Sequence, residues 1–148
     1  MPDATVAELS EPLAAWLRSD AHDVDDAVDG WTGDLPIGQV RCHPDLAERL
    51  TQIARPVRGT RRVWVDGCPV VHHPSGAPIA CATGTSRLVV RSGLPPGALL
   101  SPWHTPGLDP AWTDLDPWAA DITFARSVEL LRTHVRRAYD LAEAGVWR

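Results

Sequence analysis

The protein has 148 residues, of which 44% are hydrophobic and 22% are charged, so the chain is long enough for one domain with a buried core and too apolar for a disordered protein. Its net charge of −5 argues against a protein whose whole surface binds nucleic acid, although a local basic patch stays compatible with it. All 14 basic residues are arginine, a usage typical of a GC-rich genome.

The sequence predicts a cytoplasmic protein that does not enter a membrane. Residues 1–4 lack the basic and apolar regions of a signal peptide, and the longest apolar stretches are much shorter than the ~20 residues of a membrane span. The three cysteines form no C-x-x-C pair, as expected of reduced thiols.

The N-terminal part is predicted to be an appendage, residues 1–35, of a single domain spanning residues 1–148. Apolar residues at helical spacing predict a helix over residues 4–18, with a kink at Pro12. The acidic stretch 20–30 is interpreted as a solvated loop or a short helix. Divalent-cation binding there is an alternative, but the spacing of the acidic residues does not match an EF-hand. A second helix is expected from Asp45 to Ala54, ended by Pro56.

The middle of the chain has the composition of β-strands separated by turns. Strands are predicted over residues 61–66, 69–73, 78–82 and 86–91, and a further strand over 111–115. Asp66-Gly67 is a strong hairpin signal between the first two strands. Residues 92–110 are rich in proline and glycine and are predicted to form an ordered loop anchored by Trp103.

A long last helix is predicted from Asp116-Pro117, an N-cap followed by an N1 proline, to about Ala144, with Gly145 as its stop. It carries an apolar stripe that could pack on the chain's own sheet or on a second copy: Phe124, Val128, Leu131, Val135, Ala138 and Ala142. The predicted fold class is α+β: an antiparallel β meander of three to five strands flanked by N-terminal helices and a long C-terminal helix.

Motifs of the common catalytic classes are absent from the sequence. There is no G-x-S-x-G, no G-x-G-x-x-G and no P-loop, which a chain without lysine cannot complete. Soft ligands on neighbouring predicted strands, Cys68, His72 and Cys81, are a candidate zinc site, although their spacing is unlike that of any zinc finger. Buried thiols and a hydrogen-bonded imidazole are the alternative interpretation.

Arginines gather before and within the first predicted strand, at positions 55, 58, 61 and 62. Together with the β hairpins they could contact a phosphate backbone, so Arg58, Arg61, Arg62 and Arg91 are candidate nucleic-acid-binding residues. A second set could form a surface for a protein partner, because tryptophan and arginine are enriched in interfaces: Trp103, Trp112, Arg132 and Arg136.

The order of these elements resembles the small MmcQ/YjbR and TfoX-N-terminal-like proteins. The resemblance is carried by residues 61–67, 69–82, 86–91, 112–115 and 137–141. It departs from the family in the insert 94–110 and in Arg91, which stands where the family has lysine. The family is largely uncharacterised, and a DNA-binding surface is suspected in some members.

These observations support three functional hypotheses. The leading one is a non-enzymatic interaction or regulatory domain that binds a protein partner or a second copy of itself. The first alternative is a nucleic-acid-binding protein that uses residues 55–62 and the hairpins. The second is a small metal-dependent enzyme that uses Cys68, His72 and Cys81.

Overall fold

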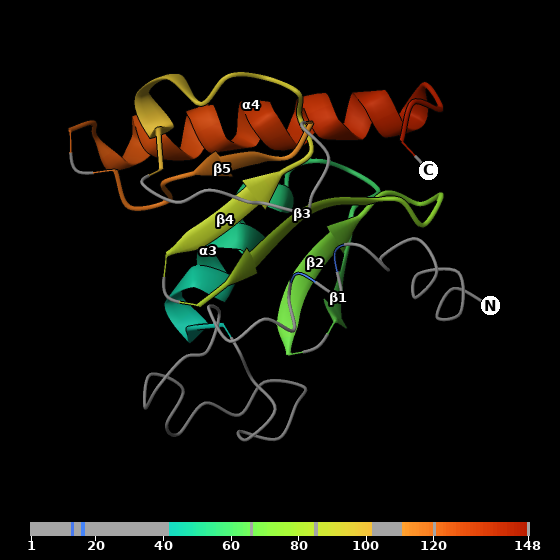
Figure 1. Ribbon diagram of the computed structural model, residues 1–148, viewed down its shortest axis with the longest axis horizontal. Coiled ribbons are helices and arrows are strands. Elements are labelled where there is room, and N and C mark those ends of the chain that lie inside the picture. The colour runs from blue at the N-terminus through green and yellow to red at the C-terminus, as the bar shows by residue number, and fades with distance from the viewer. Residues whose placement is uncertain are drawn as a thin grey trace.

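The computed structural model describes residues 42–65, 67–84, 86–101, 111–119 and 121–147, together with Leu13 and Trp16. Within these residues the chain forms a sheet of five antiparallel strands and two α-helices (Figure 1). The predicted α+β class is therefore confirmed. The acidic stretch 20–30 and Trp103 lie outside the described residues, as does most of the predicted N-terminal helix. Leu13 and Trp16 are helical and buried.

The strands follow one another as a simple meander in the order β1-β2-β3-β4-β5. They are β1 (Arg61–Val65), β2 (Cys68–His72), β3 (Pro78–Thr83), β4 (Arg87–Val90) and β5 (Thr113–Leu115). Gly67 has φ +81° between β1 and β2, the left-handed conformation that the predicted Asp-Gly turn requires. β2, β3 and β4 are buried along their whole length, which explains why the sequence there is nearly continuously apolar.

Two helices cover one face of the sheet. α3 (Pro44–Ala54) begins at His43, whose Nδ1 atom accepts a hydrogen bond from the backbone N–H of Asp45, and Pro44 is its first residue. α4 (Phe124–Glu143) is capped by the Thr123 hydroxyl, which accepts from the N–H of Arg126. A short 3-10 helix, η3 (Gly97–Leu99), precedes β5.

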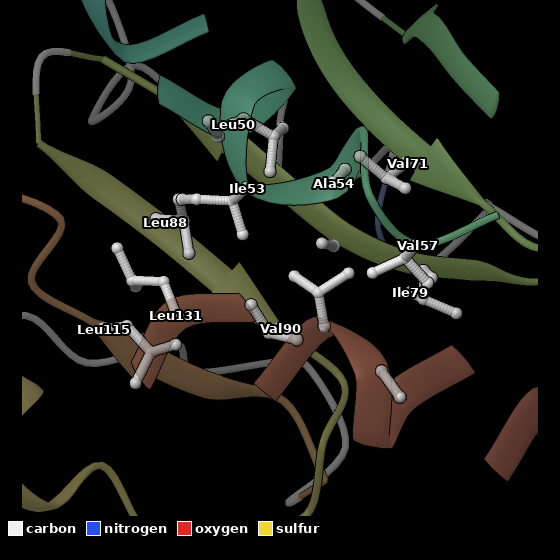
Figure 2. Close-up of a cluster of buried hydrophobic side chains, with 14 of the residues drawn as sticks. Leu50, Ile53, Ala54, Val57, Val71, Ile79, Leu88, Val90, Leu115 and Leu131 are labelled. Atoms are coloured by element: carbon white, nitrogen blue, oxygen red, sulfur yellow. The ribbon is translucent and has the colours of Figure 1, made fainter. Parts of the chain in front are cut away.

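The main core lies between these helices and the sheet, as Figure 2 shows. Leu50, Ile53 and Leu131 from α3 and α4 pack against residues of β2, β3 and β4. The strand residues of this core are Val71, Ile79, Ala80, Ala82, Leu88 and Val90. On the opposite face Leu13 and Trp16 cover a smaller cluster: Cys68, Val70, Cys81, Val89 and Trp112. Both faces of the central strands are therefore buried.

The last helix differs from the prediction at its start. Asp116 does not cap it: its carboxylate accepts from the N–H of Trp118 in a separate turn, and the helix begins seven residues later than Pro117, at Phe124. Phe124 is 63% exposed, so its predicted place on the core stripe was wrong. The rest of the stripe from Leu131 to Ala142 packs into the chain's own core.

Candidate functional site

A groove lined by four arginines is the best candidate for a binding site in the described part of the chain. It has a volume of about 260 Å³ and lies between the end of α3, the loop 55–60 and β1. Its lining includes Arg55, Arg58, Arg61 and Arg62, and its apolar residues are Ala54, Val57 and Val71. The structure thus brings together three of the four candidate nucleic-acid contacts and adds Arg55. Arg91 does not line this groove.

The loop that carries these arginines is held rigidly. The Thr60 hydroxyl donates to the backbone carbonyls of Ala54 and Val57, and the Val57 side chain is buried in the main core. Gly59, at φ +90°, lies so close to the Tyr139 hydroxyl that a Cβ atom at this position would be 2.7 Å from it. The groove is therefore built on a fixed backbone and needs no ordering of the loop before a ligand binds.

The four guanidinium groups differ in what they contact. The Arg62 side chain donates a hydrogen bond to the Thr51 hydroxyl and lies over the ring of Trp64, at 5.6 Å from the centroid. Arg55, Arg58 and Arg61 are exposed, and within the described structure they make no ion pair. Arg55 is the C-cap of α3, where the helix dipole favours a cation. The groove therefore presents positive charge that no carboxylate among the described residues neutralises.

Arg91 makes structural contacts with two tryptophans. Its guanidinium carbon lies 4.3 Å from the ring centroid of Trp147 and 5.8 Å from that of Trp112, and its backbone carbonyl accepts a hydrogen bond from the Trp147 indole N–H. Arg87 lies in the same way over Trp16, at 5.4 Å. Arg87 and Arg91 thus form cation–π contacts with three of the tryptophans, and these contacts hold the sheet to the segments that pack on it.

The predicted partner surface is not assembled in the described residues. Trp112 is buried in the smaller cluster, on the face of the sheet opposite the helices. Arg132 donates to the backbone carbonyls of Gln52 and Ile53, so it satisfies the last turn of α3. Arg136 is exposed on α4. Trp112 and Arg132 therefore lie on different sides of the sheet and have structural contacts there.

Cys68 and Cys81 belong to the smaller cluster on one face of the sheet, whereas His72 belongs to neither core cluster and lies at the far end of β2. Cys68 and His72 are the two ends of β2, about 13 Å apart along a strand, and Cys81 pairs with Val70 between them. Within the described residues no group of three ligating side chains is placed to hold a metal ion. The Cys68 thiol contacts the Thr83 hydroxyl, and burial raises the pKa of the Cys81 thiol, so it stays protonated. The zinc hypothesis gains no support from this geometry.

His72 is the most unusual buried polar side chain of the set. It is 0% exposed, and neither ring nitrogen has a hydrogen-bond partner in the described structure. Burial lowers its pKa to about 4, the Arg61 charge acts in the same direction, and the backbone of Val70 opposes them. The imidazole is therefore neutral at pH 7 and costs the fold two unsatisfied polar atoms.

A cluster around His73 could not be predicted from the sequence, because Glu143 is 70 residues away from it. His73 Nδ1 accepts from the backbone N–H of Ser75 and lies 2.9 Å from its Oγ atom, so the proton sits on Nε2, which donates to Glu143 at 2.6 Å. The order resembles a serine–histidine–acid triad. However, the N–H groups of Gly76 and Ala77 already donate within this turn. They cannot also stabilise an oxyanion, so we interpret the cluster as a structural anchor.

No helix in the described residues is long and apolar enough to cross a membrane. No protein-family model, no curated protein and no solved structure matches the chain.

Proposed function

We propose that the protein is a small nucleic-acid-binding domain whose arginine groove contacts the phosphate backbone. The observation that carries this proposal is the convergence of Arg55, Arg58, Arg61 and Arg62 on one fixed groove, with three of them lacking any ion pair in the described structure. A guanidinium group donates two parallel hydrogen bonds to a phosphate, and several in a row suit a partner with repeated anions.

The charge of the whole chain limits this mode of binding. At a net charge of −5 the remaining surface repels a polyanion, so contact is confined to the groove and its rim. The positively charged groups come from the loop 55–60 and from β1, and they do not lie on a recognition helix that could enter a DNA groove. The expected binding is therefore of modest affinity, depends on phosphate contacts and discriminates little between sequences.

Fluorescence anisotropy with a labelled DNA duplex of mixed sequence tests the proposal. The variant Arg58→Gln/Arg61→Gln should bind at least about tenfold more weakly than the wild type, because it removes two phosphate contacts. Arg136→Gln/Arg137→Gln is the matched control: it makes the same change in charge at two exposed positions of α4, outside the groove. Equal losses in the two variants would show that net charge alone governs binding, and the groove would not be the site.

A further inference from the structure

A second surface, independent of the groove, is formed by Arg49, Trp118 and Phe124; we call it the Arg49 surface. The guanidinium carbon of Arg49 lies 4.6 Å from the Trp118 ring centroid and 4.3 Å from that of Phe124. Arg49 belongs to α3, Trp118 to the turn after β5, and Phe124 is the first residue of α4. Two segments that are distant in sequence, α3 and the connection from β5 to α4, thus build one small patch.

The arginine in this patch lacks the hydrogen-bond acceptors that it needs. Arg49 is only 9% exposed, and its Nη1 atom is buried with no partner. Within the described structure its guanidinium makes no hydrogen bond and no ion pair, only the two ring contacts. Burial of an unpaired cation is costly, and the two ring contacts offset only part of that cost. The side chain is therefore arranged for an acceptor that arrives from outside.

The two rings beside it are exposed, and the backbone that carries each of them is held by a hydrogen bond. Phe124 is 63% exposed and Trp118 is 39% exposed, which is unusual for side chains of this size. The Trp118 backbone is fixed by its hydrogen bond to Asp116, and the Phe124 backbone follows the Thr123 cap. Tryptophan and arginine in such a setting are typical of the residues that dominate protein–protein binding energy.

The charges around the patch indicate the kind of partner. Arg49 is one cation, Asp116 and Asp121 lie in the same connection as Trp118, and the next arginine, Arg126, is 3.4 Å from Glu129. Among the described residues of the patch Arg49 alone offers an unpaired positive charge, which suits one carboxylate with apolar neighbours better than a polyphosphate with several anions. We propose that the Arg49 surface binds an acidic segment of a protein partner, with a carboxylate accepting hydrogen bonds from Arg49 and apolar side chains covering Trp118 and Phe124.

Selection from a random peptide library displayed on phage, with the intact protein as bait, tests this proposal. The expected result is enrichment of peptides with an acidic residue flanked by apolar ones. A synthetic copy of the strongest peptide should bind about tenfold more tightly than its copy with Gln or Asn in place of the acid. Selection of no peptide, or of peptides that bind equally well without the acid, would overturn the proposal.

Substitutions test whether the selected peptide binds at the Arg49 surface. Phe124→Ser and Arg49→Met should each weaken the selected peptide at least about tenfold. Val146→Ser, which changes another exposed apolar residue beyond the other end of α4, should leave the peptide's affinity unchanged. Arg49→Met should still fold, because it removes an unpaired buried cation. If Arg49→Met fails to fold, Phe124→Ser still tests the same surface. Arg58→Gln/Arg61→Gln should bind the peptide normally, which separates this proposal from that of the groove. If Phe124→Ser still bound the selected peptide as tightly as the wild type, the proposal for the Arg49 surface would be contradicted.

Discussion

The Nε2 atom of His73 lies 2.6 Å from Oε2 of Glu143, which joins the turn between β2 and β3 to the last turn of α4. The two residues are 70 positions apart in sequence. The His73 ring also packs on Tyr139, at 4.6 Å between centroids, and Tyr139 in turn contacts Gly59 of the groove loop. One chain of contacts therefore connects the end of α4 to the loop that carries the arginines.

The first prediction concerns this link. Because the Glu143 side chain is 65% exposed, a double-mutant cycle with His73→Ala and Glu143→Ala should give a coupling energy of only about 0.5–1 kcal/mol. Urea unfolding of the wild type, both single variants and the double variant measures it. Strictly additive losses would show that the contact contributes nothing to stability.

The second prediction follows from His72, whose pKa is lowered from its ordinary value of 6.5 to about 4. As the pH falls through this interval the unfolded chain takes up a proton that the folded chain does not, so the free energy of unfolding decreases, by up to about 3 kcal/mol. At pH 7 and above the group is neutral in both states and has no such effect.

His72→Leu should remove this decline and should not destabilise the protein at pH 7, because it also removes two unsatisfied buried nitrogens. Burial also lowers the pKa of His134, which hydrogen-bonds to Ser92, so a smaller decline should remain. Urea midpoints at pH 7, 6, 5 and about 4.5 test this. Parallel stability curves for wild type and variant would contradict it.

The third prediction concerns Gly59. Its Cβ position is 2.7 Å from the Tyr139 hydroxyl and its φ is +90°, so Gly59→Ala should cost about 2–3 kcal/mol from strain and collision together. Gly97→Ala is the control, since Gly97 also has positive φ but nothing within 4 Å, and it should cost only about 1 kcal/mol. Adding Tyr139→Phe to Gly59→Ala should recover the difference in chemical unfolding. Equal costs at the two glycines would exclude the collision.

The fourth prediction separates the two contacts between Trp147 and Arg91. Trp147→Phe removes the 2.9 Å hydrogen bond from the indole N–H to the Arg91 carbonyl but keeps a ring beside the guanidinium, and should cost about 1 kcal/mol. Trp147→Ala removes both contacts and should cost about 2–3 kcal/mol. Thermal and urea unfolding of the wild type and both variants measure these two losses of stability. Identical losses would mean that stacking on Arg91 adds nothing.

Features that depend on local sequence could be predicted. The strands and turns were recognisable because β-branched residues alternate with glycine and proline signals. The arginine cluster, though not the groove that it lines, was recognisable because its four arginines lie within eight consecutive residues. The start of α4 was mispredicted because Asp116-Pro117 suits a turn as well as a helix cap.

Features that depend on tertiary structure could not be predicted. Arg49, Trp118 and Phe124 come from three separate elements, and each alone has an ordinary local sequence. The same holds for His73 and Glu143. Arg91 was predicted as a nucleic-acid contact, and its stacking against Trp147 could not be foreseen, because that contact depends on how the chain returns after α4.

The most direct test of the arginine groove is the salt dependence of DNA binding. If four arginines each neutralise one phosphate, the logarithm of the association constant should fall with the logarithm of salt concentration with a slope of about −3.6. In Arg58→Gln/Arg61→Gln the slope should be about −1.8, whereas Arg136→Gln/Arg137→Gln should keep the wild-type slope. A slope near zero in the wild type, or the same slope in the groove variant, would contradict binding of a phosphate backbone in this groove.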